Sequence, residues 1–198
     1  MAVRLPFLTS TNFSGLFNER FWQNAWPVPP RNQLQRGALV PDGELPAVGF
    51  SAPVRLSRVW QAQPLLLVFT RIFTEHQYCP LCYPYLKALN ENYETFQGKG
   101  VAVLVVTSTD AQQSEKVKAD MDLKMPLLYD PSCQVFRKYR TGQALGAPLP
   151  AQFLIDQEGK LRYRHLFSFL EANAPLERLF QEIDALAKGA TAAGAETR

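Results

Sequence analysis

Short apolar runs separated by turn residues dominate the chain from about residue 47 onward. Residues 65–69 (LLLVF) and 101–106 (VAVLVV) are continuous apolar runs, which is the pattern of strands buried on both faces. Between these runs, large apolar residues recur at intervals of three and four positions, at Leu86, Leu89, Tyr93 and Phe96. This spacing predicts a helix. Strand, helix and strand in this order predict a parallel βαβ unit with a right-handed crossover.

The second half of the chain repeats the two kinds of segment. Helices are predicted near residues 112–121, from Asp130 onward, and after Asn173 as an N-cap. Strands are predicted near 125–129, 153–155 and 161–166, the last two as a hairpin. This order predicts an α/β fold with a central mixed β-sheet that is flanked by helices on both faces.

Residues 1–46 differ from the rest in their aromatic and proline content. Phe13, Phe17 and Phe21 recur every four residues, which predicts one apolar helical stripe that ends at the proline-rich residues 26–30. This extension either packs as an arm on the body or offers an aromatic surface to a protein partner or a membrane interface. The predicted organisation is an extension over 1–46, a domain over 47–189 and a flexible tail over 190–198.

Composition narrows the class of protein. Hydrophobic residues make up 46% and charged residues 20%, as in globular proteins, and the net charge of +3 is too small to indicate nucleic-acid binding. No apolar run approaches the roughly 18–20 residues of a membrane span. The sequence therefore predicts a cytoplasmic protein without a transmembrane segment and without a nucleic-acid partner.

Three cysteines are too few for a disulfide framework, but Cys79 and Cys82 form a C-x-x-C pair. Cys79 is expected where a strand ends and a helix begins, with Pro80 at the first helical position. Unpaired backbone N–H groups and the helix dipole should lower its pKa below the usual value of about 8.5. Cys82 shares the inward face of the helix with Leu86, which suits a less exposed resolving thiol.

Other interpretations of these residues stay open. The two cysteines could be ordinary core residues, or His76, Cys79, Cys82 and Cys133 could be the four ligands of a zinc ion. Cys133 is predicted at the start of another helix, where it is either a sensor or resolving thiol or a small buried residue. His76 is either a group that tunes the Cys79 thiolate or a plain loop residue.

Three segments occur in the order found in one known family. Residues 48–53 read VGFSAP, FTR at 69–71 is followed by YCPLC at 78–82, and residues 150–161 read PAQFLIDQEGKL. These segments resemble the V-G-x-x-A-P, F-x-R…(W/Y)-C-P-x-C and P-x-x-F-x-I-D-x-x-G-x-(I/L) elements of peroxiredoxin-like proteins. Those proteins form the alkyl hydroperoxide reductase/thiol-specific antioxidant branch of the thioredoxin-like superfamily. The similarity covers about residues 47–188.

The resemblance implies a thioredoxin-like fold in which Pro150 is a cis-proline that faces the redox cysteine. It also implies that Cys79 attacks a peroxide and that Cys82 then forms a disulfide with it, with no cofactor or metal. A thioredoxin-type or glutathione-type reductant would regenerate the pair. The sequence departs from the family where a Thr or Ser usually stands three residues before the reactive cysteine. His76 occupies that position here.

Further departures concern the positive charge and the donors at the site. Thr74 stands five residues before Cys79, and Leu149 replaces an arginine that typical members carry before the following strand. Arg71 is the candidate replacement for that charge.

The sequence thus leads to a peroxiredoxin-like, antioxidant thiol oxidoreductase with a redox-active disulfide. One alternative is a disulfide oxidoreductase that uses the same cysteines on disulfide substrates. The other is a non-catalytic interaction module whose aromatic extension recruits a larger assembly.

Overall fold

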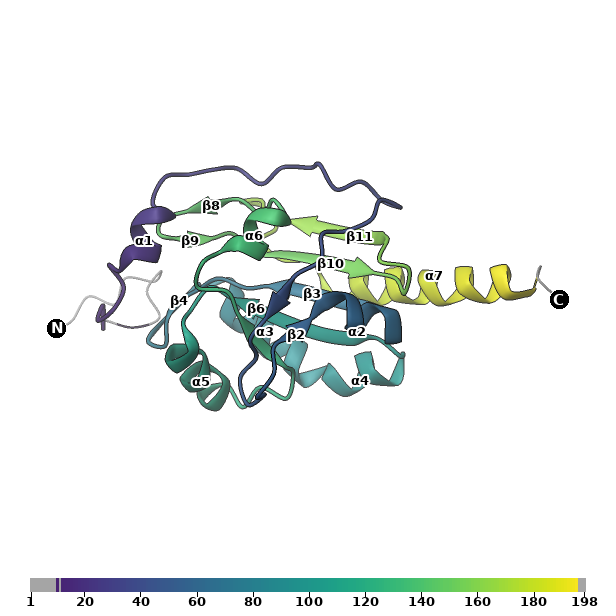
Figure 1. Cartoon of the computed structure of the whole chain (residues 1–198), viewed down its shortest axis with the longest axis horizontal. Helices are drawn as coiled ribbons and strands as arrows, with labels where there is room; N and C mark the ends of the chain where they lie inside the picture. Colours follow the sequence, from purple (N-terminus) through teal and green to yellow (C-terminus); the bar gives the residue numbers. More distant parts are fainter. Residues whose placement is uncertain (1–9, 11, 196–198) are drawn as a thin grey trace.

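Five strands form the central sheet of the computed structural model, which describes residue 10 and residues 12–195 (Figure 1). Their spatial order is β11-β10-β3-β6-β7. Their bounds are β3 Leu65–Phe69, β6 Ala102–Thr107, β7 Leu127–Tyr129, β10 Ala151–Ile155 and β11 Leu161–Leu166. Strands β3, β6 and β7 are parallel, whereas β10 is antiparallel to both β3 and β11. The predicted mixed sheet and α/β fold are confirmed.

Helices cover both faces of this sheet, as the sequence predicts (Figure 1). The helix bounds are α1 Glu19–Gln23, α2 Leu56–Ala62, α3 Cys82–Glu91, α4 Tyr93–Gly98, α5 Ala111–Asp120, α6 Gln134–Lys138 and α7 Leu176–Ala195. Buried side chains of α3, α4, α5 and α7 pack in one apolar cluster, and those of α2 and α6 pack in the other. The sheet separates the two clusters.

Strand β3 contributes to both clusters because successive side chains of a strand point to opposite faces. Leu65, Leu67 and Phe69 belong to the cluster of α2 and α6, and Leu66 and Val68 belong to the other. All five side chains are fully buried. The continuous apolar run is therefore a central strand that is covered on both faces.

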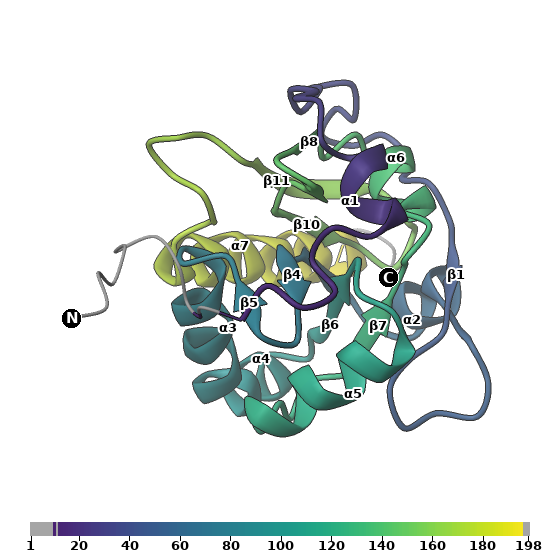
Figure 2. The ribbon, with the colours of Figure 1, turned by 90° about the vertical axis from the view of Figure 1, so that its left-hand side faces the viewer.

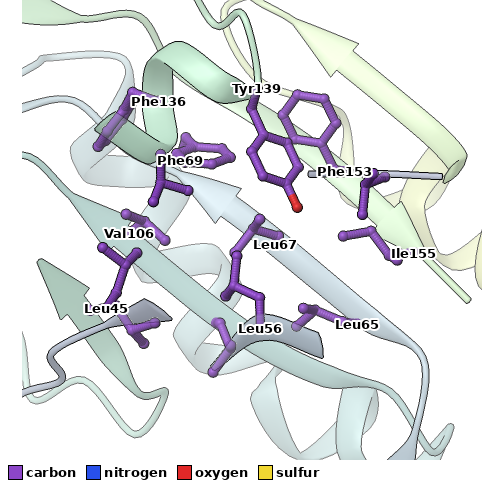
Figure 3. Packing of buried hydrophobic residues seen from close by; sticks show 14 of the residues in the cluster. Leu45, Leu56, Leu65, Leu67, Phe69, Val106, Phe136, Tyr139, Phe153 and Ile155 are labelled. Atoms are coloured by element: carbon purple, nitrogen blue, oxygen red, sulfur yellow. The ribbon is translucent and has the colours of Figure 1, made fainter. Parts of the chain in front are cut away.

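Aromatic rings fill the cluster of α2 and α6 near the end of β3 (Figure 3). The Phe69 ring centroid lies 4.8 Å from that of Phe136, 5.2 Å from that of Tyr139 and 5.8 Å from that of Phe153. The Tyr139 hydroxyl donates a hydrogen bond of 2.8 Å to the carbonyl of Pro41, which satisfies the one polar group of this cluster of rings. This packing fixes the strand from which the cysteine segment departs.

Three small strand pairs lie outside the central sheet. They are β1 Glu44–Leu45 with β2 Val54–Arg55, β4 Ile72–Thr74 with β5 Gln77–Tyr78, and β8 Gln143–Ala144 with β9 Ala147–Pro148. The β4–β5 hairpin is the segment between β3 and the cysteine pair, and the β8–β9 hairpin precedes β10. Both hairpins therefore lie next to the region of chemical interest.

The described part of the N-terminal extension packs along the body, which agrees with the arm interpretation (Figure 2). Its backbone pairs with Gln143 through Val28 and with Lys160 through Leu39. The predicted helical stripe is wrong for most of its length, because the helix α1 covers only Glu19–Gln23. Helix α1 begins where the Asn18 side chain accepts a hydrogen bond from the Phe21 N–H. Residues 1–9 and 11 of the extension lie outside the described residues.

Two predicted helix starts and the predicted tail need correction. Helix α6 begins at Gln134 rather than at Asp130, whose carboxylate accepts hydrogen bonds from backbone N–H groups at the start of α6. Asn173 does not cap α7, because its side chain bonds elsewhere. Helix α7 runs to Ala195, so residues 190–195 continue the helix that the tail was expected to follow. Residues 196–198 lie outside the described residues.

The described helices do not meet the requirements of a membrane span. None of those in residues 10 and 12–195 has both the length and the apolar character that crossing a bilayer requires.

Candidate active site

Cys79 and Cys82 lie at the carboxyl end of β3, after the β4–β5 hairpin has turned the chain back. The Cys79 N–H donates a 3.3 Å hydrogen bond to the Arg71 carbonyl, which joins the cysteine segment to the end of β3. The Cys79 carbonyl in turn accepts hydrogen bonds of 3.0 Å from the N–H groups of Cys82 and Tyr83. The motif is thus a reverse turn that leads directly into α3.

The helix begins later than the sequence predicts. Helix α3 starts at Cys82, so Pro80 and Leu81 form the turn and Pro80 is not the first helical residue. The correction leaves the expected anion-stabilising groups in place, because the N–H groups of Leu81 and Cys82 hydrogen-bond to the Cys79 sulfur. Both N–H groups lie at the start of α3, where no preceding helical turn supplies an acceptor, and the Cys82 N–H also donates to the Cys79 carbonyl.

The pKa of Cys79 is lowered to about 6. The largest cause is a hydrogen bond from the Cys82 thiol. The N–H groups of Leu81 and Cys82 and the charge of Arg71 act in the same direction, and burial opposes them. Cys79 is 5% exposed, so the anion is held by neighbouring groups rather than by bulk water. The pKa of Cys79 is thus lowered, as the sequence predicts from its place at the start of a helix.

The pKa of Cys82 moves the other way and is raised well above its usual value. The hydrogen bond to Cys79 keeps the proton on Cys82, and burial and the Cys79 charge add to this effect. Cys82 is 1% exposed and both thiols are free. The proton that lies between the two sulfurs therefore stays on Cys82. Cys79 is the thiolate that can attack, and Cys82 is the protonated thiol.

Arg71 is the charged partner of the pair. It is buried, it interacts electrostatically with Cys79 and Cys82, and it donates a hydrogen bond to the Ala144 carbonyl. Burial lowers the pKa of Arg71, and the Cys79 charge opposes this. Its guanidinium carbon lies 4.6 Å from the centroid of the Phe73 ring, and its Nε has no hydrogen-bond partner. Arg71, the positive charge that the sequence offers for this site, therefore interacts with both cysteines.

Thr74 and His76, which the sequence offers as supports for Cys79, make their observed contacts within the β4–β5 hairpin. The Thr74 hydroxyl is buried and accepts the His76 N–H at 3.1 Å within the β4–β5 turn. The His76 ring is 42% exposed and lies 3.8 Å from the Glu75 carboxylate. Neither side chain contributes to the lowered pKa of Cys79.

Pro150 lies at the end of the sheet that carries the cysteines, but it is not a cis-proline. In β10, Ala151 pairs with Phe69, which places Pro150 opposite Thr70 at the carboxyl end of β3. None of the described peptide bonds is cis, so the expectation of a cis bond before Pro150 is wrong. The trans bond is the ordinary state of an X–Pro peptide, and the Leu149 N–H is held by the Gly142 carbonyl at 3.0 Å.

Gln152 and Asn173 form a hydrogen-bond network that holds the cysteine turn, a role that the sequence does not predict. The Asn173 side chain donates to the Leu81 carbonyl at 3.1 Å and accepts from the Gln152 amide at 3.0 Å. The side-chain Oε1 of Gln152 also accepts a hydrogen bond of 2.8 Å from the Ala174 N–H. This network connects β10, the start of α7 and the turn. An asparagine 92 positions from Leu81 gives no local sequence signal of such a contact.

The N-terminal extension also reaches the site. The buried Arg20 donates to the Ser108 hydroxyl at 2.6 Å and to the carbonyls of Ile72 and Phe73. A mostly apolar pocket of about 160 Å³ lies between the extension and the cysteine turn. It is lined by Phe13, Leu16, Phe21, Phe73, Gln77, Tyr78, Pro80 and Leu145. The extension is therefore one wall of the surface beside Cys79.

Cys133 does not join the other two cysteines. It is 1% exposed and lies beside Asn24, whose amide approaches the sulfur at 3.7 Å. Burial raises the pKa of Cys133 to about 11, against the direction expected from a helix dipole. Among the residues that the structure describes, no three His, Cys, Asp or Glu side chains are grouped to hold a metal ion. The four residues of the zinc alternative are thus not gathered.

Comparisons with known proteins give a family and a fold. A family model described as "AhpC/TSA family" matches residues 37–164. Thiol-disulfide oxidoreductase ResA of Geobacillus thermodenitrificans is 33% identical over 86 residues, which cover 43% of this chain and 47% of that protein. ResA of Bacillus cereus is 31% identical over 86 residues, which cover 42% of this chain and 46% of that protein. The chain spans about half the length of the curated relatives it matches.

Solved structures with the same fold include peroxide and disulfide enzymes. Peroxidoxin BcpB from Mycobacterium tuberculosis is 20% identical with a TM-score of 0.66, covering 77% of this chain and 98% of that one. The 2-Cys peroxiredoxin of Plasmodium vivax is 19% identical with a TM-score of 0.69, covering 79% and 83%. A Chlorobium tepidum protein assigned as thiol:disulfide interchange protein DsbE is 25% identical with a TM-score of 0.60, covering 77% and 98%. The thioredoxin-like fold expected from the sequence is confirmed.

Proposed function

Because the chain belongs to the AhpC/TSA family, we propose that it is a thiol-dependent oxidoreductase whose Cys79–Cys82 pair exchanges with disulfides. The observation that carries the proposal is the opposite displacement of the two thiol pKa values, with Cys79 at about 6 and Cys82 well above its usual value. A thiolate is the attacking species in disulfide exchange. At neutral pH Cys79 is therefore ionised and Cys82 keeps its proton.

The reaction follows from this arrangement. The Cys79 thiolate attacks one sulfur of a substrate disulfide, forms a mixed disulfide and releases the other substrate sulfur as a thiolate. Cys82 then loses its proton and attacks the Cys79 sulfur, which releases the second substrate thiolate and leaves a Cys79–Cys82 disulfide. Two electrons pass from the pair to the substrate. An external thioredoxin-type or glutathione-type thiol returns them, so that no cofactor or metal is needed.

The surroundings of Cys79 favour a disulfide over a peroxide as the oxidant. A peroxide site needs donors that stabilise the charge developing on the leaving oxygen. Thr74 and His76, the sequence candidates for such donors, bond within their own hairpin. The surface beside the cysteine turn is instead apolar, with Leu81 at 54% and Leu145 at 72% exposure. Such a surface suits a polypeptide substrate.

Peroxide reduction is the second candidate, and Arg71 is the observation that favours it. Its buried charge is close enough to affect the pKa of Cys79, and its Nε is without a hydrogen-bond partner. In this mechanism Cys79 attacks a peroxide oxygen and becomes a sulfenic acid, and Cys82 condenses with it to a disulfide and releases water. Arg71 would stabilise the departing oxygen.

A stopped-flow comparison separates the two candidates. Reduced protein is mixed with a disulfide-bonded peptide or with hydrogen peroxide, and the rates are compared with those of a free thiol whose pKa is matched to that of Cys79. We expect the peptide disulfide to react faster than the free-thiol reference, and peroxide to react no faster than it. A peroxide rate well above the reference that falls in Arg71→Ala would favour the peroxidase instead. A Cys79→Ser variant that retained either reaction would contradict the role of Cys79 in both mechanisms. A parent protein that reacted with neither oxidant faster than the reference would favour the interaction module.

A further inference from the structure

A second pocket lies between the N-terminal extension and the segment from α6 to β9, away from the residues assigned to the cysteine chemistry. Its volume is about 280 Å³, close to the lower end of the roughly 300–1,000 Å³ of small-molecule sites. It is lined by Asn24, Val28, Pro29, Arg31, Cys133, Phe136, Arg137, Arg140, Gly142, Gln143 and Pro148. None of these residues takes part in the proposed reaction. We call it the arginine-lined pocket.

The charge of the arginine-lined pocket is uncompensated. Arg31, Arg137 and Arg140 belong to its lining, and no Asp or Glu does. Within the described part of the chain, none of these three arginines forms an ion pair. Of their side chains, only that of Arg137 donates a hydrogen bond to another described residue, and its acceptor is the Ser132 carbonyl. Three exposed arginines that line one small cavity attract an anion, and the planar donors of a guanidinium suit a carboxylate or phosphate.

Apart from Asn24 and Gln143, the rest of the pocket lining is apolar. Val28, Phe136 and Pro148 contribute hydrocarbon surface. Cys133 adds a neutral sulfur, because burial raises the pKa of this thiol to about 11 and keeps it protonated. A free inorganic ion would leave this surface in contact with water, whereas a ligand with a small apolar body would cover it. The lining therefore matches an anion that carries a hydrocarbon or aromatic group.

The two walls are fixed to each other by backbone hydrogen bonds. Val28 and Gln143 exchange N–H to carbonyl bonds of 2.8 Å, and the Arg31 N–H donates to the Arg140 carbonyl at 3.0 Å. A Cβ atom added to Gly142 would lie 2.6 Å from the Val28 carbonyl oxygen, so the walls approach as closely as only glycine allows. The backbones of Arg31 and Arg140 are thus held side by side before any ligand arrives, which reduces the ordering cost of binding.

The geometry points to a binding site for a small amphipathic anion, a carboxylate or phosphate monoester with a compact apolar body, in the arginine-lined pocket. The guanidinium groups bind the acidic oxygens, and Val28, Phe136 and Pro148 contact the apolar body. Because the pocket joins the extension to the body, a bound ligand bridges the two. The inference does not depend on which oxidant the cysteines use.

Isothermal titration calorimetry of the reduced full chain tests this site, with phenyl phosphate as the probe. Benzyl alcohol serves as an uncharged probe, and inorganic phosphate serves as a probe without an apolar body. The test variant is Arg31→Gln/Arg140→Gln, and the single variant Arg31→Gln is a second measurement if the double variant unfolds. Arg58→Gln is the matched control, since Arg58 is exposed in α2 and does not line the pocket.

We expect saturable one-to-one binding of phenyl phosphate by the parent and by Arg58→Gln. Binding should weaken at least about tenfold in the double variant, as the loss of a charge-assisted hydrogen bond predicts. Inorganic phosphate should bind more weakly than phenyl phosphate, and benzyl alcohol should not saturate. The inference is overturned if the parent does not bind phenyl phosphate saturably, if the arginine variants bind as the control does, or if inorganic phosphate binds equally well.

Discussion

The hydrogen bond from Cys82 is the largest cause of the lowered pKa of Cys79, and its removal gives a quantitative prediction. The pKa falls from 9.0 for an ordinary cysteine to about 6. At roughly 1.4 kcal/mol per pKa unit, the folded protein favours the Cys79 thiolate by about 4 kcal/mol. A hydrogen bond to a charged group is worth about 1.5–3 kcal/mol, or about one to two pKa units.

Cys82→Ala deletes this donor and should raise the pKa of Cys79 to about 7–8. Cys82→Ser keeps a hydroxyl donor at nearly the same place, so the pKa should stay within about one unit of the parent value. The two variants differ in one oxygen atom, which makes the serine variant the matched control for the loss of the resolving thiol. The N–H groups of Leu81 and Cys82 and the charge of Arg71 remain in both.

The assay is the pH dependence of Cys79 alkylation by iodoacetamide, followed by peptide mapping, in the range of about pH 4–9. Cys133 does not interfere, because its pKa is raised to about 11 and its side chain is buried. The alkylation rate of the parent should rise through pH 6 and then level off. If Cys82→Ala showed the same midpoint as the parent, the backbone and Arg71 would be the source of the acidity and our reasoning would be refuted.

Three further predictions concern the extension, the β8–β9 turn and pH. Arg20→Ala should lower the free energy of unfolding by at least about 1.5 kcal/mol in denaturant titrations, because a buried charged donor is lost. The same variant should speed hydrogen exchange in residues 18–24. Unchanged exchange there would contradict the anchoring role of Arg20. Gly146→Ala should destabilise by more than about 1 kcal/mol, since φ is +84° and the new Cβ would lie 2.0 Å from the Phe21 ring. Gly98→Ala, with nothing within 4 Å, is the control expected to be neutral or stabilising. The reduced parent should be more stable than Cys79→Ala, with the full difference in the free energy of unfolding present above about pH 9 and a decline toward about pH 6. The reason is that the pKa of Cys79 is depressed in the folded state, so protonation removes the contacts of the thiolate. A difference that grows on acidification would contradict this prediction.

The sequence predicts the sheet well because its strands carry strong local signals. Residues 65–69 are predicted to be a strand from their continuous apolar run, and residues 161–166 from the hairpin turn that precedes them. Both are strands with those bounds in the structure. The cysteine pair was found in the same way, from spacing alone. The direction of the pKa change of Cys79 also followed from local backbone chemistry, since unpaired N–H groups precede any helix.

What the sequence misses depends on distant contacts. Arg20 bonds to groups that lie 52 or more positions away, and Asn173 bonds to a carbonyl 92 positions away, so no local pattern reveals either. Thr74 and His76 precede Cys79 by five and three residues, and their observed contacts within the β4–β5 hairpin depend on the turn that this segment makes. The start of α3 is predicted two residues early because the tight turn at Pro80 and Leu81 resembles a first helical turn in sequence.

The central claim is that Cys79 is the sulfur that attacks a substrate disulfide and that Cys82 resolves the product. The most direct test is to trap the mixed disulfide: Cys82→Ser is mixed with a disulfide-bonded peptide at neutral pH, and the adduct is located by mass spectrometry. The account predicts one stable adduct, on Cys79, which the parent resolves to a Cys79–Cys82 disulfide. An adduct on Cys133, or a parent protein that forms no Cys79–Cys82 disulfide while the peptide is reduced, would contradict it.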